Sequence, residues 1–441
     1  MSNRISSIDK RIVLKLLREK ISGKIGRVDM VVNQTLQKRK YILSLAKKYP
    51  TPFYLFDQKA LDERVQEFSK TFCHHIPNLD IFYAVKSNNH PYLLKTMVRH
   101  GLGLDVSSGR ELGLALESKA KKIIFSGPGK TESELNLAIR NNQKIIINID
   151  SFGELRRLGN LLDKKNKKIR AGVRIYTKYH GNWNKFGISL DDLAVFFRQA
   201  KKYKNISLDG IQCHMSWSKD DQPYRKMLLA IASFIKNNFS AKDRQALKFI
   251  DFGGGFENNR LDGYYPWLVA KNEVIKIAGD YFGKPKNFAE KYYLTESVPL
   301  EKYAETISLT IKEALKPLVD CQYYCEPGRI LSAKSMFLVF RVVDVKEKDI
   351  VILDGGINMV GSDDYDYFYI PAINLSQPAK REIKCRLYGP LCTPYDFWTH
   401  YCYAKKNKEG DVIVFPNMGA YSYSLAQNFI KPIPKTRVLK F

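Results

Sequence analysis

Short apolar runs alternate with longer amphipathic stretches from about residue 51 to residue 335, and this alternation limits the possible folds more than any other feature of the sequence. The apolar runs predict buried strands, and the stretches between them have the spacing of helices. Strands that alternate with helices indicate βα units and a parallel sheet. The predicted strands are Ile81–Val85, Lys122–Ser126, Lys144–Ile149, Ile169–Ile175, Leu208–His214, Phe249–Asp251 and Cys321–Cys325. The predicted helices include Pro91–His100, Glu132–Asn141, Ser151–Leu162 and Leu190–Lys202.

Seven or eight such units close most naturally into a (β/α)8, TIM-like barrel, with an open doubly wound sheet as the structural alternative. From Met336 onward, strand-like runs follow one another with short turns and indicate a mostly antiparallel β domain. The segment Thr51–Phe56 also reads as a strand and could join that domain. We therefore predict an α/β protein with a helical extension over residues 1–50, a barrel over 51–335 and a C-terminal β domain over 336–441. The predicted strands of the β domain are Met336–Val345, Asp349–Asp354, Glu382–Tyr388 and Val412–Phe415.

Composition argues against several classes of protein. Hydrophobic residues make up 44% of the 441, which is ordinary for a globular protein. No run of 18 apolar residues occurs, so neither a transmembrane helix nor a membrane partner is expected. The first 20 residues contain no continuous apolar stretch, which argues against a secretory signal and predicts the cytoplasm. The seven cysteines are odd in number and follow no repeated spacing, which argues against a disulfide framework or a zinc site.

The net charge of +27 raises the question of nucleic-acid binding, because clustered Lys and Arg neutralise phosphates. Part of this charge lies in the first 50 residues, which hold thirteen Lys and Arg against three Asp and Glu. No nucleic-acid-binding motif accompanies it, so no nucleic-acid partner is predicted. A solvated surface explains most of the charge, and attraction of an anionic substrate is the functional alternative.

Three segments that follow predicted strands carry side chains suited to chemistry. Lys86 directly follows the strand 81–85; in a barrel this position reaches the active site, where a lysine can attack an aldehyde. The run Gly253–Gly255 can present backbone N–H groups to a phosphate. Glu326 suits a partner that must stay protonated, such as a pyridine nitrogen, and Arg329 suits a phosphate. The alternatives without a functional role are a surface lysine at position 86 and a tight turn at Gly253–Gly255.

Taken together, the segments resemble the fold-type III pyridoxal-phosphate decarboxylases, the family of diaminopimelate, ornithine and arginine decarboxylases. The likeness runs from about Thr51 to Tyr421, and nine elements in family order are very improbable by chance. These elements are Tyr-Ala-Val-Lys-Ser-Asn at 83–88, Leu-Asp-Val-Ser-Ser at 104–108, Ser-Gly-Pro-Gly-Lys at 126–130, Lys-Phe-Gly-Ile at 185–188, His214, Gly253–Gly255, Glu326–Arg329, Gly-Pro-Leu-Cys at 389–392 and Gly-Ala-Tyr at 419–421.

This resemblance implies an alanine-racemase-like barrel, a homodimer with active sites at the subunit interface, and pyridoxal 5′-phosphate as the cofactor. By position, Lys86 is the Schiff-base lysine and Glu326 is the partner of the pyridine nitrogen. His214 stacks on the ring, its alternative being a buried histidine at a strand end. Cys392 comes from the opposite subunit and returns a proton to the α-carbon, its alternative being an inert buried thiol. The residues implied in holding the phosphate are Ser216, Gly254, Gly255, Gly328, Arg329 and Tyr421.

The chain departs from the family pattern in three places. The phosphate-binding serine expected three residues after His214 is replaced by Trp217, with Ser216 and Ser218 on either side. The acidic residue that follows the cysteine and meets a distal ammonium is here Thr393, which cannot pair with a cation in that way. No Arg-x-x-x-Tyr follows Asp354-Gly355-Gly356, where diaminopimelate decarboxylases place groups for the distal carboxylate; the chain reads Asn-Met-Val-Gly-Ser-Asp-Asp over 358–364 instead.

The variant Cys-Thr-Pro-x-Asp, from Cys392 to Asp396, resembles the branch of the family found in siderophore assembly. Those enzymes decarboxylate an amino-acid unit already condensed with citrate. Such a substrate has no free distal amine and carries several carboxylates, which fits Thr393 and the basic composition. Thr393 and Asp396 are the predicted substrate-binding residues.

Three alternatives stay open. A diaminopimelate or basic amino-acid (ornithine or lysine) decarboxylase shares the same cofactor residues. A pyridoxal-phosphate-binding protein without turnover is a different class, and the presence of both Lys86 and Cys392 argues against it. An amino-acid racemase would normally need a catalytic tyrosine from the β domain.

Overall fold

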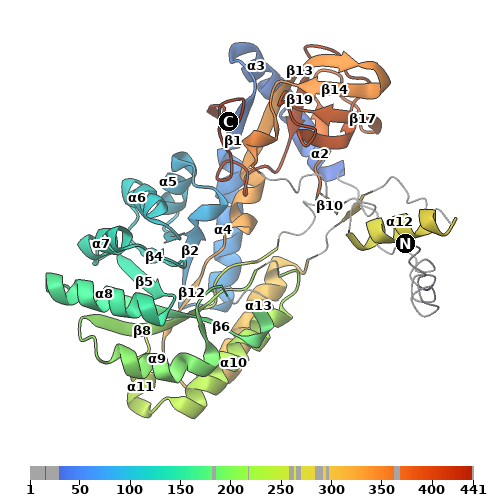
Figure 1. The fold of residues 1–441 in the computed structure, drawn as a ribbon. Coiled ribbons are helices and arrows are strands. Elements are labelled where there is room, and N and C mark those ends of the chain that lie inside the picture. The colour runs from blue at the N-terminus through green and yellow to red at the C-terminus, as the bar shows by residue number, and fades with distance from the viewer. Residues whose placement is uncertain are drawn as a thin grey trace, which may run out of the picture.

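The computed structural model describes residues 15, 29–180, 185–216, 218–257, 263–264, 270–283, 292–294, 297–361 and 368–439. Within these residues, eight parallel strands form a closed barrel, in which β5 pairs with both β4 and β6 (Figure 1). The barrel predicted from the sequence is confirmed, and the open sheet is excluded. One strand, β3, was not predicted as such; its sequence Gly-Leu-Asp-Val has no continuous apolar run. Around the ring the strands are β2 (Leu79–Ala84), β3 (Gly103–Val106), β4 (Ile123–Phe125), β5 (Ile145–Ile149), β6 (Ile169–Tyr176), β8 (Ile206–Cys213), β9 (Phe249–Asp251) and β12 (Gln322–Cys325).

Helices between the strands surround the barrel (Figure 1). Four of them start at a hydroxyl side chain that accepts the N–H of the third helical residue, namely Ser108, Thr131, Ser151 and Ser240. Such caps satisfy N–H groups that the helix itself leaves unpaired. The surrounding helices are α4 (Gln58–His75), α5 (Pro91–Arg99), α6 (Gly109–Glu117), α7 (Glu132–Arg140), α8 (Phe152–Lys165), α9 (Leu193–Ala200), α10 (Gln222–Asn238), α11 (Ala241–Ala246) and α13 (Leu300–Thr310).

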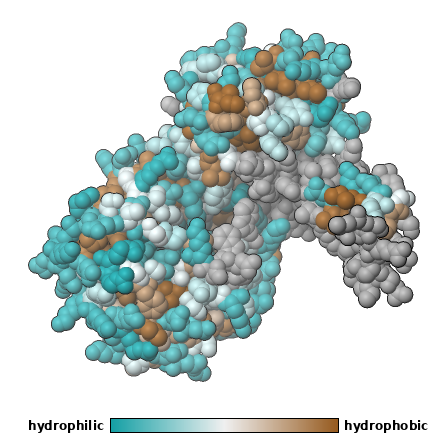
Figure 2. All heavy atoms as spheres, in the orientation of Figure 1, coloured by the Kyte–Doolittle hydropathy of each residue, from teal (hydrophilic) through white to brown (hydrophobic). Residues whose placement is uncertain are grey.

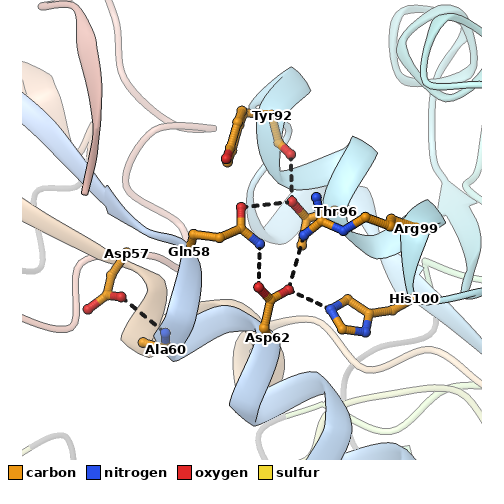
Figure 3. Close-up of polar contacts among 8 residues, drawn as sticks. All are labelled: Asp57, Gln58, Ala60, Asp62, Tyr92, Thr96, Arg99 and His100. Carbon is orange, nitrogen blue, oxygen red and sulfur yellow. Dashed lines mark hydrogen bonds and ion pairs between the residues drawn. The ribbon is translucent and has the colours of Figure 1, made fainter. Parts of the chain in front are cut away.

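A polar cluster joins α4 to α5 on the outside of the barrel (Figure 3). Asp62 of α4 lies at its centre and accepts hydrogen bonds from Gln58 Nε2 at 2.8 Å and Arg99 Nη2 at 3.2 Å, and it pairs with His100 Nε2 at 2.5 Å. Thr96 Oγ1 bonds to Gln58 Oε1 at 3.3 Å. The cluster therefore fixes the two helices to each other independently of their apolar contacts.

The second sheet is built mainly from antiparallel pairs, with parallel pairing only for β14–β17, β16–β18 and β1–β20. The strand β1 (Phe53–Asp57) belongs to this sheet, because it pairs with β13 through Phe53 opposite Val339. In order, the strands are β14 (Ile350–Leu353), β17 (Glu382–Tyr388), β18 (Phe397–Tyr403), β16 (Ala372–Asn374), β19 (Val412–Phe415), β13 (Met336–Lys346), β1 and β20 (Thr436–Leu439). Short strands β10 (Gly263–Tyr264), β11 (Tyr293–Leu294) and β15 (Phe368–Tyr369) form a separate small sheet.

Two helices of the predicted N-terminal extension, α2 (Asp29–Gln37) and α3 (Arg39–Lys48), pack on the second sheet. Their buried residues include Val32 and Ile42, which share one apolar cluster with Val339 and Val414 of the sheet. Hydrogen bonds run in both directions, since Arg39 Nε donates to Leu375 O and Arg341 Nη2 donates to Ala46 O. These helices therefore complete the core of the C-terminal domain.

The hydropathy of the surface differs between the barrel and the C-terminal domain. Figure 2 shows mainly hydrophilic residues over the barrel helices and more apolar surface over the C-terminal sheet. A further helix, α12 (Ala270–Tyr281), carries an exposed apolar stripe of Val274, Ile277 and Tyr281. No helix in the described part of the chain is long and apolar enough to cross a membrane.

Candidate active site

A cavity of about 850 Å³ opens at the carboxyl ends of the barrel strands, within the usual size range of a ligand site. Its wall comes from seven barrel strands or the turns after them, and Tyr421 of the C-terminal domain adds one side. The lining residues are Ala84, Lys86, Ser107, Gly127, Pro128, Arg174, Ile175, Tyr176, Tyr179, Phe186, His214, Met215, Ser216, Gly255, Phe256, Glu257, Glu326, Gly328, Arg329 and Tyr421.

The strand period explains why this end of the barrel is polar. A buried layer of Phe82, Ile124, Ile146, Phe249 and Tyr324 fills the interior. Alternate residues of a strand face the same side, so the residues two positions further on point inward one layer higher. On those same strands these residues are Ala84, Ser126, Asn148, Asp251 and Glu326. A polar layer therefore lies on an apolar plug, directly below the cavity.

Lys86 lies in the 3-10 turn η1 (Val85–Ser87) after β2 and is half-buried in the cavity wall. In the described residues its amine makes no hydrogen bond or ion pair. The turn itself is held by the C-terminal domain, because Ser87 O accepts from Tyr421 N at 2.7 Å and from Ser424 Oγ at 3.2 Å. Asn88 Nδ2 adds a bond to Gly419 O at 2.8 Å. The lysine is thus fixed at its backbone and free at its amine.

Glu326 is buried and is contacted by two side chains from β8 and the turn after it, beyond the adjacent strand β9. Gln212 Nε2 donates to its two oxygens at 3.2 and 3.3 Å, and His214 Nδ1 lies 3.1 Å from Oε2. Burial raises the pKa of Glu326, but its hydrogen bond with His214 and the positive charges of Lys86, Arg174 and, in acid, His214 outweigh burial and bring the pKa to about 2. Burial and the charge of Lys86 lower the pKa of His214 to about 4, so His214 is neutral at pH 7.

The glycine run after β9 packs so tightly that side chains are excluded. A Cβ on Gly254 would lie 2.1 Å from Glu326 O, and one on Gly255 would lie 2.1 Å from Met215 O. Gly255 also has a φ of +87°, which favours glycine. The Gly254 N–H donates to His214 Nδ1 at 3.1 Å, whereas the Gly255 N–H has no acceptor among the described residues. A small anion can therefore approach this backbone closely.

Arg329 and Tyr421 form the cationic side of the cavity. The guanidinium of Arg329 lies 4.8 Å from the centre of the Tyr421 ring. Tyr421 has a φ of +58°, which is uncommon for a residue with a side chain, and its N–H bond to Ser87 O holds it there. Arg329 reaches the cavity from the turn after β12, and Tyr421 reaches it from the second domain.

These residues suit pyridoxal phosphate. The buried Glu326 carboxylate can face a ring nitrogen, the free amine of Lys86 can hold an aldehyde, and the Gly255 N–H and Arg329 can take a phosphate. The cavity thus offers each chemical part of that cofactor a complementary group.

The structure also separates the two serines near His214. Ser216 lines the cavity, whereas Ser218 is buried behind it, with its N–H on Gly255 O and its carbonyl accepting from Tyr303. Trp217 lies outside the described residues.

The residues predicted around Cys392 do not reach the cavity of their own chain. Cys392 is exposed and Thr393 is half-exposed. Asp396 is buried; it accepts the N–H of Ile357 at 2.7 Å and of Leu391 at 2.6 Å. Its carboxylate therefore folds the loop and fastens it to the 3-10 turn η8 (Ile357–Met359), which is a different role from the direct substrate contact predicted for Asp396.

Several cavity residues were not predicted. Arg174, at the end of β6, is nine-tenths buried and stacks on Phe186 at 4.7 Å. Its position at the carboxyl end of a predicted strand was the available signal. Ser107, Gly127 and Phe186 lie in segments that carried the family resemblance but were not assigned a role.

Comparison with known proteins places this site in a family. The family described as "Pyridoxal-dependent decarboxylase, pyridoxal binding domain" matches residues 59–333, so the chain belongs to it. The protein is therefore a pyridoxal-phosphate-dependent amino-acid decarboxylase with an alanine-racemase-like fold.

Relatives of known activity cover most of the chain. Diaminopimelate decarboxylase of Aquifex aeolicus is 25% identical over 87% of this chain and 85% of its own length. A 2-[(L-alanin-3-ylcarbamoyl)methyl]-2-hydroxybutanedioate decarboxylase of Staphylococcus aureus is 26% identical over 87% and 92%. Among solved structures, diaminopimelate decarboxylase of M. jannaschii in complex with L-lysine superposes with a TM-score of 0.74 at 21% identity, covering 90% of this chain and 89% of that one.

Proposed function

We propose that this decarboxylase removes the α-carboxylate from the amino-acid unit of a citrate-conjugated diamino acid, as in siderophore biosynthesis. The observation that carries the proposal is Thr393, which stands after Cys392 where family members that bind a distal ammonium have a carboxylate. A hydroxyl suits a substrate whose distal nitrogen is already an uncharged amide. The name of the S. aureus relative describes such a molecule, an alanine unit joined through an amide to a citrate skeleton.

The cavity residues divide the work as follows. Lys86 holds the cofactor through its amine and releases it to the substrate amine. Gly255, Ser216, Gly328, Arg329 and Tyr421 hold the phosphate, with Gly254 shaping the turn. Glu326 keeps a ring nitrogen protonated, and His214 lies against the ring. Bound pyridoxal phosphate supplies the electron sink that accepts the electrons left when CO2 departs.

Return of a proton to the α-carbon is assigned to Cys392 of a second copy. Its exposure outside the cavity of its own chain supports this assignment, because the thiol is then available to a neighbouring subunit. A homodimer with shared active sites follows from the same argument. All seven cysteines are free thiols, which supports the cytoplasm as the compartment of the protein. We also propose that the chain divides at residues 50 and 335 into a helical extension, a barrel and a C-terminal β domain.

A second candidate, diaminopimelate decarboxylation, is favoured by the names of relatives such as the Campylobacter jejuni enzyme, 28% identical over 87% of this chain and 89% of its length. The absence of Arg-x-x-x-Tyr after Gly356 weighs against it.

The deciding experiment measures CO2 release from citryl conjugates of diamino acids, diaminopimelate, ornithine, lysine and arginine. Turnover of a citryl conjugate is the expected result. Turnover of a free diamino acid alone would reject the proposed substrate but retain the proposed decarboxylation.

Lys86→Ala should abolish the visible absorption of the lysine-bound cofactor, whereas Lys95→Ala, on the exposed face of α5, should leave it intact.

A further inference from the structure

Three carboxyl groups from three strands meet in the polar layer beneath the cavity. They are Asp105 at the end of β3, Asp251 at the end of β9 and Glu326 after β12, and each is at most 2% exposed. Three ionised carboxylates excluded from water would repel one another strongly, and burial disfavours each charge. The cluster must therefore hold protons.

The neighbouring cations do not offset three negative charges. Lys86 and Arg174 are the positive groups that act on Glu326 and Asp105, and Glu111 adds a further carboxylate beside Asp105. His214 brings no charge at pH 7, because burial lowers its pKa to about 4. Lys86 is moreover the amine that holds the cofactor.

Hydrogen bonds indicate which carboxyl is ionised. Glu326 receives both bonds from Gln212 and faces His214. Asp251 accepts only the Gly253 N–H, at 2.8 Å through Oδ1. Its Oδ2 is buried and faces no donor in the described residues. The two carboxyl groups belong to adjacent segments, because β9 pairs with β12 and Glu326 N donates to Gly253 O at 2.8 Å. A proton on one of two neighbouring buried carboxyl groups removes their mutual repulsion and makes that group a hydrogen-bond donor.

The acidities of the three groups agree with this arrangement. Burial and the charge of Glu326 raise the pKa of Asp251 well above its usual range, and they raise that of Asp105 to about 8. The pKa of Glu326 is lowered to about 2. Asp251 and Asp105 therefore hold protons and Glu326 holds the negative charge, although the three groups lie in one buried layer.

We propose that Asp251 is a neutral carboxylic acid that donates its proton toward Glu326, so that the negative charge of the cluster stays on Glu326. Asp251 is a positioning residue, since it touches neither cofactor nor substrate and acts through Glu326. This inference rests on the proposed role of Glu326 as the partner of the ring nitrogen. A neutral neighbour lets Glu326 face that nitrogen as a carboxylate without a second charge beside it.

Infrared spectroscopy can detect the proton without any turnover. The full-length protein, prepared with 13C-labelled aspartate or with 13C-labelled glutamate, is compared at pH 7 in the cofactor-loaded and cofactor-free forms. We expect a C=O stretching band of a protonated carboxylic acid that shifts with labelled aspartate. Asp251→Asn should remove part of this band and Asp105→Asn should remove the rest. Asp80→Asn should remove none, because the Asp80 side chain is 29% exposed and its carboxylate pairs with Lys122.

A band that shifts only with labelled glutamate, or one that Asp251→Asn leaves whole, overturns the proposal. The isotope experiment needs no variant, so a folding failure of Asp251→Asn does not block the test. Asn retains a neutral N–H donor, so Asp251→Asn should bind pyridoxal phosphate at least about tenfold more tightly than Asp251→Ala, which has no donor. If Lys86 proved not to hold the cofactor, the proposed function would fail while the aspartate band would still be seen.

Discussion

At the scale of single residues, the effect of a charge depends on whether water can reach it. Lys130 and Glu154 form an ion pair at 2.8 Å whose side chains are each 1% exposed. The Lys130 ammonium also donates to Gly127 O and Asn148 O, both at 2.8 Å. Gly127 lines the cavity, so the buried pair supports the turn that forms one wall of the site.

Replacing Lys130 by Met should destabilise the protein by about 3–5 kcal/mol, because Glu154 would be left as an unpaired buried charge. Lys122→Met is the matched control: Lys122 pairs with Asp80 at 2.8 Å but is 60% exposed, and its loss should cost about 0–1 kcal/mol. Chemical denaturation measures both. Equal losses of unfolding free energy in the two variants would contradict the conclusion that the Lys130–Glu154 pair is shielded from water.

At the scale of elements, polar clusters and apolar faces join helices to their neighbours. The cluster between α4 and α5 depends on Asp62 (Figure 3). Burial raises the pKa of Asp62, but hydrogen bonds from His100 and Gln58, together with the charges of His100 and Arg99, outweigh it and lower the pKa.

Asp62→Asn should lower the free energy of unfolding by about 0.5–1 kcal/mol at pH 7, since the cluster is partly exposed. A carboxyl whose pKa is lowered on folding stabilises the protein above its unfolded pKa, and this stabilisation is lost as pH falls through the folded value. The difference between wild type and variant should thus shrink below about pH 4. Denaturation curves over a pH series test this, with the exposed Glu63→Gln as control; a constant difference would refute it.

The N-terminal helices make a separate prediction. Ile42 of α3 is fully buried against the C-terminal sheet, and truncation to Ala should cost about 2–5 kcal/mol. Met30 of α2 is 55% exposed, and Met30→Ala should change stability by less than about 0.5 kcal/mol. If thermal unfolding showed no difference between these variants, α3 would not be docked as described.

Sequence patterns predicted the elements better than their long-range partners. Seven barrel strands were predicted from local apolar runs, because strand burial repeats within a few residues. The parallel pairing of β1 with β20 depends on contacts almost four hundred residues apart, which local patterns do not contain. For the site, Lys86 and Glu326 were found from strand ends and family likeness. Arg174 was missed. The bonds of Asp396 to Leu391 N and Ile357 N were also missed, since only the folded backbone presents these groups to it.

At the scale of the whole molecule, the proposed active site needs two copies of the chain. Mixing inactive Lys86→Ala and Cys392→Ala subunits should restore about a quarter of wild-type activity, because half of the dimers would be hybrids with one intact site of two. Mixing Lys86→Ala with Glu326→Ala should restore none, since both lesions lie in the same cavity. Equal recovery in the two mixtures, or none in the first, would reject the shared site.

The route of the chain also sets an order of assembly during synthesis. The ribosome makes β1 before the barrel and β13–β20 after it, yet β1 pairs with β13 and β20 in one sheet. The turn that carries Lys86 is fastened by Gly419, Tyr421 and Ser424, which emerge after every barrel strand. A nascent chain that stops before residue 419 would therefore hold a barrel whose reactive lysine is not yet fixed. Capture of the cofactor is accordingly expected to be one of the last steps in the maturation of the enzyme.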